Sequence, residues 1–235
     1  MKRQRIDYSG FRLSRIGEPQ FRHLKLLWAW VFYFIMYFLT ENLIPPENCH
    51  VVHSALDDLI PFNEYFLFFY AGWYILVFGT LLYYLLYDAE QFSKLQTYIL
   101  ITQVVAMVIY VLWPSRQDLR PAVFPHDNIL TRLMAFIYAF DTSTGVCPSL
   151  HVAYSLGILS VCLKDKALPR WYKVFLTFFV LMICVSVCFV KQHSALDVLA
   201  ALPVCLLAEY LTFHVFFPDK GKTAPVPLPP EGEKK

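Results

Sequence analysis

The chain has 235 residues, of which 57% are hydrophobic and 17% aromatic, and its mean hydropathy is +0.48. This composition excludes a soluble globular domain, which must cover its surface with polar groups, and predicts an all-α integral membrane protein. The formal net charge of +2 is too small to indicate a nucleic-acid partner, and the hydrophobic composition makes the membrane the expected surrounding.

Six apolar runs predict transmembrane helices. An α-helix rises about 1.5 Å per residue, so roughly 20 apolar residues cross a hydrocarbon core of about 30 Å. The predicted spans, in chain order, are Leu26–Ile44, Phe62–Leu86, Leu95–Trp113, Pro148–Leu163, Trp171–Val190 and Ser194–Phe217, of which the fourth is short. Because no long linker separates them, residues 24–218 are expected to form one six-helix membrane domain.

The remaining segments are assigned by their length and polarity. Residues 1–23 are polar and basic and are expected to lie in the cytoplasm, whereas the Pro-rich residues 219–235 predict a disordered tail. Val51–Ile60 and Ile129–Phe140 are too short to span and predict short surface helices.

The positive charges set the expected orientation, because cytoplasmic loops accumulate Lys and Arg. With both termini in the cytoplasm, all but four of the 20 Lys and Arg residues fall on the inner side. The four exceptions on the extracytoplasmic side are Arg116, Arg120, Arg132 and Lys191.

Three polar segments interrupt the apolar pattern on this outer side. They are WPSRQDLRP at Trp113–Pro121, CPSLH at Cys147–His151 and KQHSALD at Lys191–Asp197. Each adjoins the end of a predicted span, so the topology places all three at one membrane level, where a helix bundle can bring them together.

The segment that begins at Pro148 has the features of an anion site. Pro suits the first turn of a helix, and the backbone N–H groups of Ser149, Leu150 and His151 would then be free at a positive helix end. The Ser149 hydroxyl adds a donor, and Arg120 with Lys191 would supply full charges. The alternative is that Pro-Ser only starts a helix and the cations only anchor the chain at the interface.

His193 and Asp197 are four residues apart at the start of the sixth predicted span, so they share one helix face. A carboxylate that accepts the proton of one imidazole nitrogen leaves the other nitrogen free for nucleophilic attack. Alternatively, the pair is a structural hydrogen bond that joins helices.

Together the three segments resemble the type 2 phosphatidic acid phosphatase superfamily, which shares the ordered pattern KxxxxxxRP, PSGH and SRxxxxxHxxxD. The chain matches this pattern at Arg120-Pro121, at Pro148-Ser149-Leu150-His151, and at His193 with Asp197. PSLH followed by KQHxxxD is more similar to the branch of inositol phosphorylceramide synthase-like phosphotransferases and bacterial phosphatase-like proteins. The chain departs from the pattern at three positions, Trp113, Leu150 and Val187, where the family has Lys, Gly and Arg.

The resemblance implies a lipid phosphate phosphatase or phosphotransferase that needs no metal or other cofactor. His193 would become a phosphohistidine, Asp197 would orient it, and His151 would act first as general acid and then as general base. The phosphate oxygens would be held by Arg120, Lys191, Ser149, Leu150 and Arg116, the cations Arg116 and Lys191 replacing those missing from the pattern. The site would face the extracytoplasmic or luminal side.

Other functions remain open at this stage. A phosphodiester headgroup transferase would use the same residues with an alcohol in place of water. A proton-coupled transporter could use His193, Asp197 and His151 as a relay, and an inactive scaffold would explain Trp113 and Val187. Two further features stay open: a disulfide between Cys49 and Cys147, and a weak zinc pattern of His50, His53 and Asp57.

Overall fold

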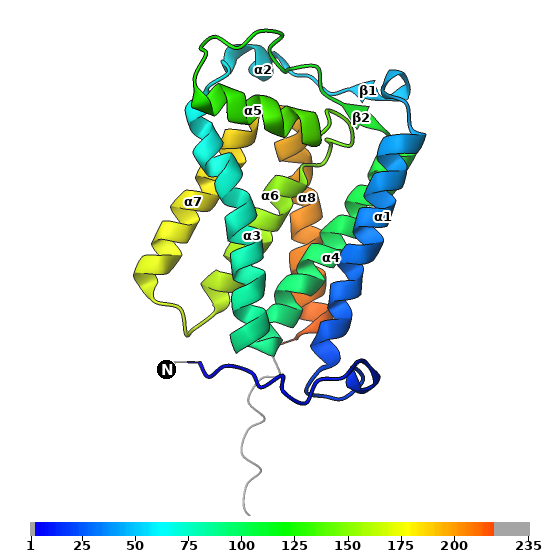
Figure 1. Cartoon of the computed structure of the whole chain (residues 1–235), viewed down its shortest axis with the longest axis vertical. Coiled ribbons are helices and arrows are strands. Elements are labelled where there is room, and N and C mark those ends of the chain that lie inside the picture. Colours follow the sequence, from blue (N-terminus) through cyan, green and yellow to red (C-terminus); the bar gives the residue numbers. More distant parts are fainter. Residues whose placement is uncertain (1–2, 219–235) are drawn as a thin grey trace, which may run out of the picture.

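The computed structural model describes residues 3–218 and is mostly helical, as the composition predicts. The α-helices of these residues are α1 (Trp28–Leu43), α2 (Ala55–Leu59), α3 (Leu67–Tyr87), α4 (Ala89–Leu112), α5 (Ile129–Phe140), α6 (Leu150–Lys164), α7 (Arg170–Phe189) and α8 (Ala195–Tyr210). Two short strands, β1 (His50–Val51) and β2 (Ser115–Arg116), pair in parallel. The long helices stand side by side in a bundle (Figure 1).

Five helical segments of the described chain are long and apolar enough to cross a membrane. They are Arg22–Leu43, Glu64–Tyr87, Ala89–Leu112, Arg170–Phe189 and Ala195–Phe216. The first and last of these include a 3₁₀ turn before α1 and a π-helical turn after α8. These segments are compatible with a multi-pass membrane protein, and α6, with 15 residues, is shorter than them.

The third predicted span begins earlier than its hydropathy indicates. The sequence predicts a start at Leu95, whereas α4 starts at Ala89. The Asp88 side chain accepts a hydrogen bond from the backbone N–H of Gln91 at 3.0 Å and so caps the helix. The first turn is polar, with Lys94 paired to Glu90 at 2.6 Å, and hydropathy alone cannot recognise it as helical.

The short helix α6 lies at the centre of the bundle, where it packs against α4, α7 and α8. Most of its side chains are buried, including Ala153, Ile158 and Val161. At Gly157 an added Cβ would lie 2.5 Å from the ring of Tyr98, so glycine allows α6 and α4 to approach closely. The N-terminal end of α6, which carries the PSLH segment, is therefore enclosed by other helices.

One end of the bundle is covered by α5, α2 and the two strands (Figure 1). On α5, Met134 is fully buried and the Tyr138 hydroxyl donates to the carbonyl of Val190 at 2.7 Å. Ile129–Phe140 is helical as predicted, but only Ala55–Leu59 of the predicted Val51–Ile60 helix is, because Val51 belongs to β1. This cover lies directly over the loop that leads into α8.

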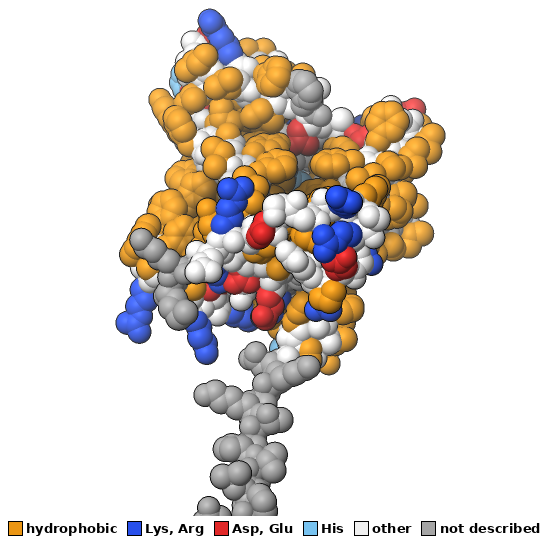
Figure 2. Space-filling view, turned by 60° about the horizontal axis from the view of Figure 1, so that its bottom comes forward, with side chains coloured by type: hydrophobic (Ala, Val, Ile, Leu, Met, Phe, Trp, Pro, Cys, Tyr) orange, Lys and Arg blue, Asp and Glu red, His pale blue; other side chains and the backbone are white. Residues whose placement is uncertain are grey.

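The N-terminal segment lies at the opposite end of the bundle (Figure 1). Its Arg3 forms ion pairs of 2.7 Å with both Asp165 and Asp88, which ties the segment to the ends of α6 and α3. Figure 2, which turns this end forward, shows acidic and basic side chains gathered there and hydrophobic ones over the helix flanks. The predicted disordered tail, 219–235, lies outside the described residues.

Candidate active site

The structure brings the two predicted histidines together at the covered end of the bundle. His193 Nδ1 lies 3.1 Å from Asp197 Oδ2, and His193 Nε2 lies 3.2 Å from His151 Nδ1. Asp197 is fully buried and His193 is only 6% exposed. The three residues thus form a chain of contacts in which Asp197 can hold the proton on Nδ1 and leave Nε2 of His193 with its lone pair.

Both histidines line a cavity of about 260 Å³ between α1, α3 and α6. His151 also packs against Trp73, with ring centroids 4.3 Å apart, and its Nε2 has no hydrogen-bond partner in the described part of the chain. The cavity reaches Phe34 on α1 and Phe78 on α3, which are exposed on the apolar flank. It therefore joins the histidines to the surface that lipid chains would contact.

The start of α8 positions His193 and Asp197. Ser194 is the N-cap residue, and Asp197, three residues later, completes a capping box by accepting from the Ser194 backbone N–H at 2.9 Å. The same Asp197 oxygen is the one that contacts His193. Helix capping and orientation of the imidazole therefore depend on a single carboxylate, because His193 directly precedes the N-cap.

The start of α6 has the predicted geometry of a helix N-terminus. Ser149 is the N-cap residue, but its hydroxyl is fully buried and accepts from the Val152 backbone N–H at 3.4 Å. Leu150 and His151 line the cavity. Their backbone N–H groups find no hydrogen-bond acceptor within residues 3–218, as expected for the first turn of a helix. This end of α6 offers donors to an anion in the cavity.

Arg120 lies directly behind the cavity wall. Its guanidinium donates to the carbonyls of Tyr138, Asp141 and Thr142 at 3.0, 2.5 and 2.8 Å, and to the side-chain oxygen of Gln192 at 2.6 Å. Burial lowers the pKa of Arg120 from its ordinary value. The partners Asp141, Thr142 and Gln192 line the cavity, so Arg120 braces the wall beside His193.

The other two predicted phosphate ligands point elsewhere. Lys191, at a positive φ of 54°, donates its ammonium to the backbone carbonyls of Asp57, at 2.8 Å, and Ile60. Arg116, in β2, pairs with Asp118 at 3.2 Å. Neither lines the cavity, and their predicted contacts with phosphate stay predictions.

Asp57 is a residue of this site that the sequence analysis did not place there. Its buried carboxylate accepts from the Ser194 hydroxyl at 2.6 Å and from the Ala195 backbone N–H at 2.8 Å. Burial by itself would raise the pKa of Asp57, but these hydrogen bonds and those from Ser54 outweigh it and hold the pKa below its ordinary value. The signal in the sequence was an acidic residue in the first turn of a short surface helix.

A second set of missed residues lies on the cavity wall. Asp141 accepts from the Tyr70 hydroxyl at 2.5 Å and from the Gln192 side-chain amide at 3.0 Å. Gln192, next to His193, also donates to the Tyr70 hydroxyl at 3.1 Å. These contacts connect α3, the end of α5 and the loop between α7 and α8, and no sequence spacing relates three such distant residues.

The cysteines and the remaining histidines have separate surroundings. Cys49 and Cys147 are both free thiols, and burial raises the pKa of Cys147 to about 12. His50 stacks on Trp113, and His53 pairs with Asp58 at 2.8 Å. The Asp57 carboxylate is hydrogen-bonded to Ser194. The three residues of the weak zinc pattern thus each contact a different partner.

Comparison with known proteins adds no relative: no family model, no curated protein and no solved structure matches the chain.

Proposed function

We propose that the protein is a membrane-embedded lipid phosphate phosphatase or phosphotransferase that acts through a phosphohistidine on His193. The observation that supports this most is the contact chain Asp197–His193–His151 on the wall of a cavity that reaches the apolar flank. A nucleophile needs a base or orienting group on one side and a space for substrate on the other; Asp197 is the orienting group of His193, and the cavity that His193 lines is the space.

In the first step, Nε2 of His193 attacks the phosphorus and the bond from phosphorus to the lipid oxygen breaks. His151, protonated, gives its proton to the departing alkoxide, so a neutral lipid alcohol leaves. In the second step, water attacks the phosphorus while His151 takes a proton from the water. The bond from phosphorus to Nε2 of His193 breaks, and inorganic phosphate is released. The two steps restore both histidines to their starting protonation states.

The substrate must separate the two histidines before this reaction. With 3.2 Å between Nε2 of His193 and Nδ1 of His151, no phosphoryl group fits between the rings. His151 packs against the rings of Tyr70 and Trp73, and it lines the cavity together with Trp73. A change of its side-chain rotamer would admit the phosphate and place His151 beside the leaving oxygen.

The charge that develops on phosphate oxygens needs donors. Leu150 and His151 at the start of α6 line the cavity, and their free backbone N–H groups would supply two of these donors. The positive charge of Arg120 would stabilise this negative charge without direct contact, because the residues that it hydrogen-bonds, Asp141, Thr142 and Gln192, lie between it and the cavity. Lys191 would position the loop that carries His193, because its ammonium group joins this loop to the backbone at Asp57.

The proposed function includes a topology of six crossings. In this arrangement α6 completes the set as a short central crossing, both termini lie in the cytoplasm, and the histidines face the extracytoplasmic or luminal side. The distribution of Lys and Arg supports this orientation. Single cysteines at positions 13 and 123, in a variant whose six native cysteines are replaced by serine, test it by labelling with a membrane-impermeant maleimide in intact cells: only position 123 should react.

A second candidate, a phosphodiester headgroup transferase, is favoured by the size of the cavity. Its 260 Å³ exceed by several-fold the roughly 30 Å³ that one water molecule occupies in the liquid. The space would hold the headgroup alcohol that replaces water in the second step. The chemistry on His193 and His151 would otherwise be unchanged.

The experiment is release of inorganic phosphate from a panel of lipid phosphates by purified protein in detergent with a chelator, with an alcohol acceptor in parallel. We expect release by the wild type, with loss of at least about 1,000-fold in His193→Ala, because the nucleophile is removed. His53→Ala is the matched control, since His53 is an exposed histidine on the same end of the bundle and pairs only with Asp58.

The outcomes separate the readings. Phosphate release that disappears in His193→Ala supports the phosphatase, and headgroup transfer to the alcohol without phosphate release supports the transferase. Equal activity of wild type and His193→Ala would overturn both. If folded wild type is inactive on the whole panel, the transport and scaffold alternatives replace the proposal.

A further inference from the structure

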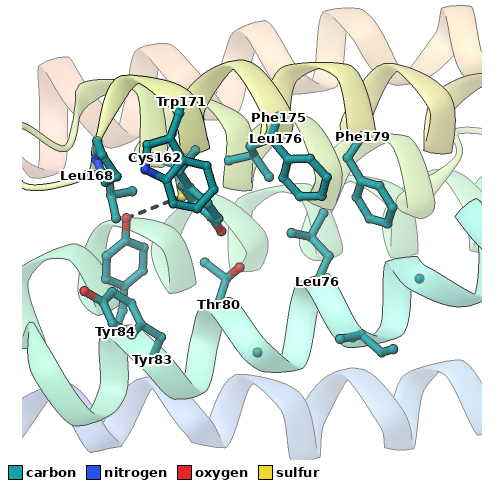
Figure 3. Close-up of a pocket in the computed structure, with 15 residues that line it drawn as sticks. Leu76, Thr80, Tyr83, Tyr84, Cys162, Leu168, Trp171, Phe175, Leu176 and Phe179 are labelled. Atoms are coloured by element: carbon teal, nitrogen blue, oxygen red, sulfur yellow. Dashed lines mark hydrogen bonds between the residues drawn. The ribbon is translucent and has the colours of Figure 1, made fainter.

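A second cavity lies on a different face of α3 from the histidines. This groove, of about 570 Å³, runs between α3 and α7 (Figure 3), and its lining includes Leu76, Thr80, Leu168, Trp171, Phe175 and Phe179. The catalytic cavity uses Trp73, Tyr74 and Val77 of α3 instead. The groove is therefore separate from the proposed active site and plays no part in the chemistry above.

The groove has the length of one membrane leaflet. Along α3 it extends from Gly72 to Tyr84, twelve residues on, which corresponds to a rise of about 18 Å. Half of a hydrocarbon core of about 30 Å is about 15 Å. An extended acyl chain of one leaflet matches this length, and the mostly apolar lining suits it.

Two glycines show where the groove is closed and where it is open. A Cβ added at Gly72 would lie 2.6 Å from the ring of Phe179, so α3 and α7 are in close contact there. A Cβ added at Gly79, two turns further along, would meet no atom within 4 Å. The groove is therefore closed at Gly72 and open at Gly79, which lies nearer the loop between α6 and α7.

The open end carries unpaired positive charge. Lys166 and Arg170 flank the lining residues Leu168 and Pro169, are exposed, and form no ion pair with any residue in 3–218. Of their basic neighbours, Lys164 is paired with Glu209, and Lys173 donates to the carbonyl of Leu163. Trp171 is 71% exposed at the same end, a position typical of the membrane interface.

From these observations we infer that the groove binds an anionic phospholipid of the leaflet on the α6–α7 loop side. One acyl chain lies along α3 between Tyr83 and Gly72, and the phosphate contacts Lys166 and Arg170. Charge complementarity selects the anionic lipid, because basic residues at a membrane surface attract anionic headgroups. The inference does not depend on catalysis by His193.

The test is native mass spectrometry of the purified full-length protein with phosphatidylglycerol and phosphatidylcholine of identical acyl chains. We expect one tightly bound phosphatidylglycerol per chain in preference to phosphatidylcholine. Replacing both cations, Lys166→Gln with Arg170→Gln, should weaken phosphatidylglycerol binding about thirtyfold and remove the preference. The matched control is Arg22→Gln with Lys25→Gln, two exposed cations at the same end that lie outside the groove.

A second variant fills the groove itself. Gly79→Trp places a large side chain where the structure has open space, so we expect it to lower binding of both lipids about tenfold or more. Equal binding of the two lipids to the wild type, or unchanged phosphatidylglycerol binding in both variants, would overturn the inference. So would a dimer that Gly79→Trp dissociates, because the groove would then be covered by a second copy of the chain.

Discussion

The Asp57 carboxylate on the cover of the bundle accepts a hydrogen bond of 2.6 Å from the hydroxyl of Ser194, which precedes α8. Asp57 accepts a second hydrogen bond at its backbone carbonyl, from the ammonium group of Lys191 at 2.8 Å. Two hydrogen bonds, both donated by the loop that carries His193 and both accepted by Asp57, therefore join the cover to this loop. Since both partners are buried, the cover and the loop are fixed relative to each other.

Asp57→Ala should disturb both stability and activity. The Ser194 hydroxyl and Ala195 N–H lose their buried acceptor, at a cost of roughly 1–3 kcal/mol in the free energy of unfolding. A shift of His193 by about 1 Å would lower the rate of phosphate release about 100-fold. Thermal unfolding and the phosphate assay measure the two effects, with the exposed neighbour in Asp58→Ala as control; equal behaviour of the two variants would contradict the positioning role.

Arg120→Lys should destabilise the cavity wall although it keeps the charge. The guanidinium satisfies three carbonyls and Gln192 at once, and an ammonium cannot reproduce this planar arrangement. We expect a loss of roughly 1–3 kcal/mol in unfolding free energy and a higher KM for lipid phosphate. Arg132→Lys, at an exposed arginine paired only with Asp127, should leave both unchanged.

The ion pair between Arg3 and Asp165 predicts a pH dependence of stability. Burial by itself would raise the pKa of Asp165, but hydrogen bonds from Arg3, Ala167 and Tyr84 outweigh it and hold the pKa below its ordinary value. The stabilisation is therefore present above the unfolded pKa of about 3.9 and is lost as the pH falls through the lower folded pKa.

Arg3→Ala should consequently lower the melting temperature at pH 7, and the difference from wild type should shrink below about pH 4. Scanning calorimetry in detergent across this range measures it. Arg5→Ala, which removes an exposed cation of the same segment, serves as control. A difference that stays constant down to pH 3 would show that Arg3 acts through packing on Tyr83 and Tyr84 and not through Asp165.

Cys147 is a third potential nucleophile near the histidines, and we expect it to take no part in the reaction. Its pKa of about 12 keeps the thiol protonated at neutral pH. Cys147→Ser should retain phosphate release within about threefold of wild type, and maleimide treatment of the native protein should leave the rate unchanged. Inactivation by both treatments would instead indicate a cysteine nucleophile.

Several features could be predicted from the sequence because they depend on local periodicity and spacing. The apolar runs give helices within a few residues of their predicted ends, apart from the polar start of α4 at Ala89. His193 and Asp197, at a spacing of four on one helix, meet as predicted. Pro148-Ser149 starts α6, because N-capping needs only the residues of one turn.

Other features needed the tertiary structure, because they join residues far apart in the chain. The sequence could place His151 and His193 at the same level, but their contact depends on how α6 and α8 pack. It also identified Arg120 and Lys191 as exceptions to the expected accumulation of positive charge on the cytoplasmic side. Which acceptors they find was decided by the carbonyl groups that loops 138–142 and 57–60 expose.

The sequence by itself thus determined that the chain forms apolar helices long enough to cross a membrane, with a histidine–carboxylate pair at one helix start, since hydropathy and i, i+4 spacing are local properties. Only the tertiary structure decided that Asp57 closes over this pair, and that the predicted cations Arg120 and Lys191 satisfy buried backbone carbonyls. The physical reason is that a buried charge takes the acceptors that packing places within reach, and packing brings together segments more than 100 residues apart, such as Asp57 and Ser194.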